Sequence, residues 1–126
     1  MITTLTKKDM RSGHTDEKAV FKSIILLTDF SEPARNAIKY AIDAFGENVE
    51  FHLVNAYYAR TSSATLLDLN DILSKESEQG LNEDKKWIDE NFAGQRLRIK
   101  SHSIFGSPID AIRKVKNQFT IDAIIM

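Results

Sequence analysis

The chain has no cysteine among its 126 residues, which excludes a disulfide scaffold, a thiolate zinc site and a cysteine nucleophile. This absence also fits the reducing environment of the cytoplasm, where we expect the protein to reside. The formal net charge is only −1, so no field of the whole molecule attracts nucleic acid or an anionic membrane. The apolar runs fall well short of the ~20 residues that a membrane-spanning helix needs. We therefore expect neither nucleic acid nor a membrane as a partner.

Several motifs of known chemistry are missing as well. The sequence contains neither the P-loop pattern G-x-x-x-x-G-K-S/T nor the dinucleotide fingerprint G-x-G-x-x-G. The nucleophile elbow G-x-S-x-G is also absent. His14, His52 and His102 lack carboxylates at metal-ligand spacing, and His52 and His102 are expected to be packed or edge residues. We expect no metal site, no catalytic residue and no conventional enzyme activity, with weak nucleotide hydrolysis as the most that the chain would catalyse.

The chain divides into a short polar tail and one domain. Residues 1–20 carry both signs of charge and lack the apolar centre of a signal peptide. We predict a disordered leader there, with a partner-binding arm as the alternative. Residues 21–126 are predicted to form the domain, and a chain of this length buries roughly two-thirds of its unfolded surface without disulfide or metal.

The domain opens with a strand, a helix and a second strand. Residues 24–27 form a short β-branched and leucine run before turn residues, which favours a strand buried on both faces. Ser31 is a good N-cap, apolar residues recur at helical spacing over residues 34–45, and Gly46 is placed to end the helix. Residues 49–56 read as the second strand. Such a unit makes a parallel strand pair with a right-handed crossover.

The middle of the chain is less regular. Residues 57–75 are predicted to be a loop with a short helix around three leucines. A polar segment, residues 74–80, is predicted to separate this piece from a second helix over residues 81–92, with Gly94 as its stop. The apolar face of that second helix includes an acidic residue, Asp84.

The last third of the chain completes the pattern. Residues 97–105 alternate between apolar or small side chains and basic ones, which is typical of a strand at a sheet edge. Ser107 is the predicted N-cap of a helix over residues 108–119. Residues 121–126 form an apolar strand of the kind found at the centre of a sheet. Four strands alternating with helices predict an α/β fold, a three-layer, doubly wound parallel sheet.

Asp29 is the best candidate for a residue that binds a small-molecule ligand. In an open α/β sheet, ligands bind beyond the carboxyl ends of the strands, and Asp29 follows Thr28 at the end of the first strand. Its carboxylate could accept hydrogen bonds from a ribose hydroxyl or an adenine amino group. The alternative is a structural aspartate that caps a loop. A phosphate is a poor partner here, because Asp29 and Glu32 place negative charge against an incoming anion.

A family resemblance supports this interpretation. Residues 22–41, KSIILLTDFSEPARNAIKYA, resemble the opening of universal stress proteins. Three further segments agree in the family's order: residues 53–56, the Gly-Ser-Pro turn at residues 106–108, and residues 121–126. The resemblance implies a sheet of order 3-2-1-4-5, of the adenine nucleotide alpha-hydrolase-like type. This order agrees with the edge character of the third strand.

The resemblance also implies a ligand and its contacts. Many family members bind ATP or AMP, the former with Mg²⁺, and are not conventional enzymes. By resemblance, Asp29 meets the adenine-ribose end with the help of Thr28 and the backbone of Ala56. Met126 matches the residue that opens the family's phosphate loop, G-x2-G-x9-G-S/T. That loop and the fifth strand are absent from this sequence.

These differences lead to further expectations. Leu27 replaces a proline that many members carry, and Ala56 replaces a larger apolar residue. Without consecutive backbone N–H groups in a glycine-rich turn, nucleotide binding is expected to be weak or lost. An apolar fourth strand without a neighbour is an open edge, so we expect a homodimer through that edge or poor solubility.

The sequence bears on four candidate functions. The leading hypothesis is a stress-response module that binds or senses adenine nucleotide. The second is a member of the same family that has lost nucleotide binding and acts through dimerisation or partner interaction. An adenylating enzyme would need a phosphate motif that is absent. A response-regulator receiver would need a phosphorylatable aspartate after the third strand, where the sequence instead reads Ser103-Ile104-Phe105-Gly106.

Overall fold

The computed structural model describes residues 22–58 and 66–125, so the predicted leader at residues 1–20 lies outside the described residues. Its elements alternate between strands and helices, as predicted. In chain order they are β1 (Ser23–Leu27), α2 (Glu32–Phe45), the 3-10 helix η2 (Gly46–Asn48), β2 (Glu50–Tyr57), α3 (Leu66–Asn91), β3 (Arg98–Phe105), α4 (Pro108–Gln118) and β4 (Ala123–Ile125).

The four strands form one parallel sheet in the order β3-β2-β1-β4. This confirms the doubly wound fold and the edge position of β3. In the register, Leu26 of β1 lies beside Leu53 of β2 and Ile125 of β4, so the carboxyl ends of these strands meet at one edge of the sheet. Although its apolar run is typical of a central strand, β4 is the outermost strand of the described sheet on that side.

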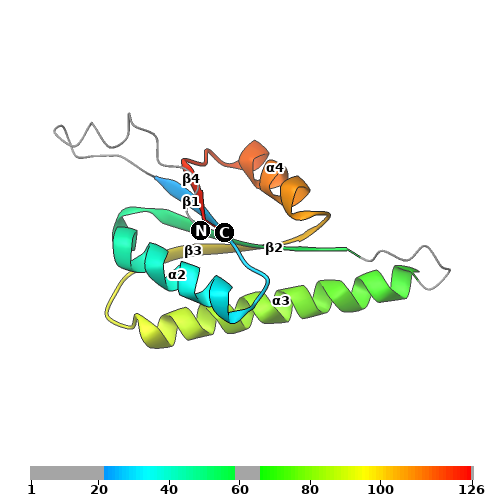
Figure 1. Cartoon of the computed structure of the whole chain (residues 1–126), viewed down its shortest axis with the longest axis horizontal. Helices are drawn as coiled ribbons and strands as arrows, with labels where there is room; N and C mark the ends of the chain where they lie inside the picture. The colour runs from blue at the N-terminus through cyan, green and yellow to red at the C-terminus, as the bar shows by residue number, and fades with distance from the viewer. Residues whose placement is uncertain (1–21, 59–65, 126) are drawn as a thin grey trace.

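The sheet is covered on both faces, which makes three layers (Figure 1). Helices α2 and α3 lie on one face and α4 lies on the other. The larger core lies between the sheet and the helix pair, and its fully buried side chains include Ile24, Leu26, Ile38, Ile42, Phe51, Leu53 and Ile88. The smaller core lies beneath α4 and is built on Ile25, Val54, Ala111 and Val115. Burial of apolar surface on both faces is the main stabilising contribution to this architecture.

Side-chain caps define where two of the helices begin, as the sequence predicts. The hydroxyl of Ser31 accepts a hydrogen bond from Ala34 N at 3.3 Å and caps α2. The hydroxyl of Ser107 accepts one from Asp110 N at 3.1 Å and caps α4. Each cap satisfies a backbone donor that the first helical turn leaves free. Gly46 has a φ of 52° after α2 and ends that helix, because this left-handed conformation suits glycine.

The prediction of two separate helices before β3 is wrong, because α3 is a single helix of 26 residues. The polar segment at residues 74–80 lies inside this helix. It makes contacts with distant parts of the chain that its polar composition does not predict. Ser77 is buried and its hydroxyl lies 2.7 Å from that of Ser103 on β3, while Gly80 lies against the ring of Phe30. These tertiary contacts outweigh the weak helix propensity of the segment. No helix of the described ranges, α3 included, is long and apolar enough to cross a membrane.

Candidate functional site

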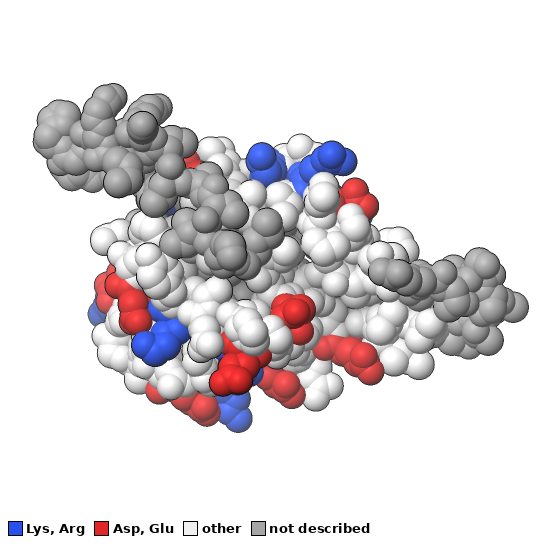
Figure 2. All heavy atoms as spheres, in the orientation of Figure 1, with Lys and Arg blue, Asp and Glu red and all other residues white. Residues whose placement is uncertain are grey.

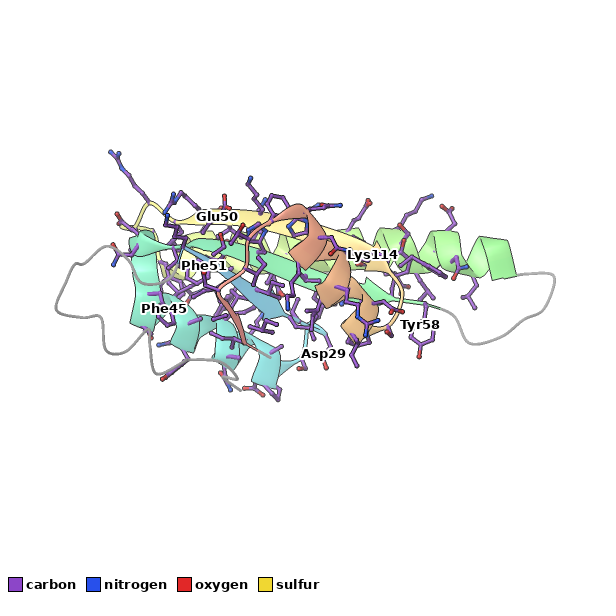
Figure 3. All side chains as sticks on the ribbon, turned by 90° about the horizontal axis from the view of Figure 1, so that it is seen from above. Asp29, Phe45, Glu50, Phe51, Tyr58 and Lys114 are labelled. Carbon is purple, nitrogen blue, oxygen red and sulfur yellow. The ribbon has the colours of Figure 1, made fainter. Side chains whose placement is uncertain are left out.

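A pocket of about 460 Å³ opens at the carboxyl ends of β1 and β2, between the first turn of α2 and the start of α4. We call it the Asp29 pocket. Its lining residues are Leu27, Thr28, Asp29, Ser31, Pro33, Ala34, Asn55, Ala56 and Pro108. Figure 3 shows Asp29 between α2 and α4, with Glu50 at the opposite end of the sheet. The position is the one at which open α/β sheets bind ligands, and the volume lies within the range of small-molecule sites.

Asp29 supplies the charge of the pocket. Its Oδ1 atom accepts two hydrogen bonds, one from the backbone N of Ser31 at 3.0 Å and one from the Ser31 hydroxyl. These bonds, the hydroxyl first and the backbone N–H second, hold the pKa of Asp29 below its ordinary value of 3.8, so the side chain is a carboxylate at neutral pH. Both Ser31 donors bind Oδ1, and no other described residue besides Asp29 itself donates a hydrogen bond to Oδ2. One oxygen of Asp29 therefore shapes the loop, as the structural alternative predicts, and the other remains available to a ligand.

Thr28 and Asn55 hold the strand ends together beneath the pocket. The backbone N of Thr28 donates to Val54 O at 2.9 Å, and the side-chain amide of Asn55 donates to Thr28 O at 2.8 Å. Thr28 and Asn55 are both buried, so these bonds are shielded from water. The two strands consequently meet the pocket in a fixed relative position.

The backbone of Ala56 extends past the last residue of β1. Because Thr28 N bonds to Val54 O, and residues two apart along a strand face the same side, the N–H and C=O of Ala56 also face the β1 side. The register of β1 ends at Leu27, opposite Val54, so β1 has no further residue to pair with Ala56. An N–H donor and a C=O acceptor from one residue thus face the pocket together.

The pocket is apolar with one negative charge. Among its described lining residues, Asp29 is the only charged one, and no lysine or arginine is present. Figure 2 shows basic side chains gathered over α4 and a predominance of acidic ones over α2 and α3. Glu32, exposed in the first turn of α2, adds a further negative charge beside the rim. The described wall is therefore unsuited to an anion and suited to a ligand that is flat, apolar and rich in hydrogen-bond donors.

The structure brings three of the four predicted ligand residues, Thr28, Asp29 and Ala56, to the same pocket. The fourth, Met126, lies outside the described residues. Sequence reasoning overlooked Asn55, although a polar residue inside a buried strand is a signal of this kind. It also placed Asp84 on an apolar helix face without assigning it a role, and Asp84 proves to be fully buried next to Thr28.

The histidines expected to be packed or edge residues lie away from the pocket. His52 is buried on β2, and its Nδ1 atom lies 2.9 Å from Nε2 of His102 on β3. His52 Nε2 lies 3.1 Å from Glu50 Oε1, and the ring of Phe119 packs against both imidazoles. In the described part of the chain, no group of three or more histidine or acidic side chains is arranged to hold a metal ion.

Comparison with known proteins places this geometry in context. The model of the universal stress protein family matches residues 21–126. A search among curated proteins finds no significant match.

Several solved structures share the fold. The chain is similar to the universal stress protein UspA from Lactobacillus plantarum, with a TM-score of 0.69 and 19% identity over 86% of this chain and 77% of that one. It is also similar to hypothetical protein MJ0577, a test case for structure-based assignment of biochemical function, with a TM-score of 0.66 and 26% identity over 86% and 75% of the two chains. Protein Rv1636 from Mycobacterium tuberculosis H37Rv has a TM-score of 0.56 and 16% identity over 86% and 72%.

Proposed function

The chain belongs to the universal stress protein family, and we propose that it is a stress-response module whose Asp29 pocket binds the nucleoside part of an adenine nucleotide. The observation that carries this proposal is an ionised Asp29 at the mouth of an apolar pocket, whose Oδ2 atom receives no hydrogen bond from another residue of the described chain. We propose a binding or sensing role in the cytoplasm and no catalytic role.

The walls of the pocket suit a purine ring. Leu27, Pro33 and Pro108 offer apolar surface to the faces of the base. Next to them, the paired N–H and C=O of Ala56 match the ring nitrogen and exocyclic amino group of adenine, which accept and donate a hydrogen bond side by side. Guanine presents a carbonyl oxygen where adenine has its amino group, so the same backbone would oppose one of its contacts.

The sugar is the natural partner of Asp29. Ribose hydroxyls are donors, and hydrogen bonds from neutral donors to a carboxylate are stronger than those between neutral groups. Since Ser31 already occupies Oδ1, the hydroxyls would bind to Oδ2.

The phosphates are the weak part of the interaction. The described wall carries no cation that could bind them, and Asp29 and Glu32 repel them. We therefore expect AMP and ATP-Mg²⁺ to bind this chain no more tightly than adenosine. Any Mg²⁺ would be carried by the phosphates, because the described residues have no metal-binding cluster of their own.

Isothermal titration calorimetry on the whole chain tests the proposal, with adenosine, AMP and ATP-Mg²⁺ as titrants. Asp29→Asn keeps an oxygen for Ser31 but loses the charge, and it should weaken adenosine binding by about tenfold, the loss of one charge-assisted hydrogen bond. Asp89→Asn is the matched control, because Asp89 is an exposed carboxylate on α3 outside the lining. Equal affinity of wild type and Asp29→Asn, or no binding of any titrant to wild type, would contradict the proposal.

A second candidate function is dimerisation, which one observation favours. β4 is the outermost strand of the described sheet on its side and consists of Ala123, Ile124 and Ile125. Apolar strands at an edge pair readily with a second copy of the same strand. In a homodimer through β4, the Asp29 pocket of each copy would lie next to the interface, at the edge of the sheet where the carboxyl ends of the strands meet.

A further inference from the structure

The loop that presents Asp29 has a strained backbone. Phe30 has a φ of 68°, in the left-handed region that large side chains rarely adopt. Such a conformation persists only when surrounding contacts over-determine it, and it occurs preferentially at functional sites. The ring of Phe30 lies against α3, a helix outside the lining of the Asp29 pocket.

The first contact is between Phe30 and Gly80. A Cβ atom placed on Gly80 would lie 2.5 Å from Cζ and 2.6 Å from Cε2 of the Phe30 ring. Any other residue at position 80 would force the Phe30 ring to move, since real Cβ atoms do not approach other carbons so closely. Glycine in the interior of a helix is otherwise unfavourable relative to alanine by about 1 kcal/mol. The ring of Phe30 is a structural reason for this glycine.

The second contact lies one helical turn further along α3, on the same face. Asp84 is fully buried, and its Oδ2 atom accepts a hydrogen bond from the Thr28 hydroxyl at 3.3 Å. Its Oδ1 atom accepts one from Nε of Arg35 on α2 at 2.9 Å. The Thr28 hydroxyl in turn accepts the backbone N–H of Phe30 at 2.9 Å. Asp84 thereby fixes the direction of the hydroxyl that holds the strained residue.

We propose that Gly80 and Asp84 form a clamp on α3 that positions the Asp29 loop, Gly80 by receiving the Phe30 ring and Asp84 by orienting the Thr28 hydroxyl. Both are positioning residues, because neither lines the pocket. The existence of the clamp does not depend on the proposed function. Its consequence, that the clamp holds Asp29 in position to bind a nucleoside, does rest on that function. A preformed loop does not need to be ordered upon binding, and this strengthens affinity.

Hydrogen exchange of the Phe30 and Ser31 amides is the primary test, because both donate within the loop. Gly80→Ala should speed exchange at both amides by about tenfold, since local opening controls their protection. The matched control is Gly94→Ala, because a Cβ at Gly94 meets no atom within 4 Å. Asp84→Ala should act as Gly80→Ala does, whereas Asp84→Asn keeps an acceptor for Thr28 and should retain slow exchange.

Thermal unfolding of a double-mutant set separates the clamp from simple helix stability. Alanine at position 80 should raise Tm when Phe30 is also alanine, because the helix then gains propensity without a clash. In the wild-type background the same substitution should not raise Tm. An equal rise in both backgrounds, with unchanged exchange at Phe30 and Ser31, would overturn the proposal.

Adenosine titration completes the test and keeps the two hypotheses apart. Gly80→Ala should weaken adenosine binding by about tenfold, and Gly94→Ala should leave it unchanged. If the wild-type chain binds no adenosine, the proposed function fails, while the exchange and unfolding results still decide whether the clamp exists. Slow exchange in Gly80→Ala together with wild-type affinity for adenosine would rule the clamp out.

Discussion

At the scale of single residues, a chain of hydrogen bonds links Glu50, His52 and His102 on the α4 face of the sheet. A carboxylate only accepts, so Nε2 of His52 carries the proton that faces Glu50. Nδ1 of neutral His52 then accepts a hydrogen bond from Nε2 of His102. Both imidazoles are thereby assigned one tautomer, and a proton added to His52 Nδ1 would oppose the N–H of His102.

Stability should accordingly fall in mild acid. Burial, the largest cause, lowers the pKa of His52 and His102 below the ordinary value of 6.5, and positive Lys100 acts in the same direction while Glu50 opposes it. The unfolded chain therefore takes up protons near pH 6.5 at which the folded chain does not. Stability is present in full above that pH and is lost as the pH falls from there toward the folded pKa values.

Urea unfolding at a series of pH values between about 7.5 and 5 measures this loss. His102→Gln removes one titrating group and should show a smaller decrease over the same range. The remaining acid dependence of that variant reports His52 and the carboxylates. Wild-type stability that stays constant or rises on acidification would show that the two histidines are not buried as neutral imidazoles.

At the scale of elements, the start of α4 depends on one side chain. The Ser107 hydroxyl accepts the N–H of Asp110, and no alanine side chain could do so. Ser107→Ala should lower the free energy of unfolding by about 1 kcal/mol, the usual contribution of an N-cap. Ser107→Thr, which retains the hydroxyl, is the control and should lose only a fraction of this. Chemical denaturation measures both, and identical stability of the alanine and threonine variants would argue against the cap.

The same scale shows which elements the sequence can predict. The beginnings of α2 and α4 were predictable because Ser31 and Ser107 are local signals next to their helices. The continuity of α3 was not, because it depends on Ser77 and Gly80 meeting residues far away in the chain. Local polarity there indicated a break, and only the tertiary structure shows that both residues face a partner.

At the scale of the whole molecule, the outer edge of β4 predicts association. Because Asp122 N bonds to Ser23 O, the alternation along the strand turns the N–H groups of Ala123 and Ile125 away from β1. We expect the mass of a dimer by light scattering, with slow amide exchange at Ala123 and Ile125. Dilution to a monomer should speed exchange at these two amides selectively. A stable monomer in which both amides exchange rapidly would contradict pairing through β4.

The overall topology was the most predictable feature, for reasons that also explain what was missed. Alternating strands and helices permit few topologies for a parallel sheet. The polar, solvent-exposed face of β3 indicated that it is an edge strand. The carboxyl ends of parallel strands then bring Asp29 and Ala56 together at one edge. The supporting contacts of Asn55 and Asp84 are both with Thr28, at sequence separations of 27 and 56 residues. The local sequence pattern does not show that residues so far apart are in contact.

An NMR titration of the ¹⁵N-labelled chain with adenosine tests whether a nucleoside occupies the Asp29 pocket. We predict saturable shifts at the amides of Thr28, Asp29, Ser31, Asn55 and Ala56, which line the pocket, and none at Asp89 on the far part of α3. Absence of shifts at saturating adenosine, or shifts confined to residues elsewhere on the molecule, would show that a nucleoside does not occupy this pocket.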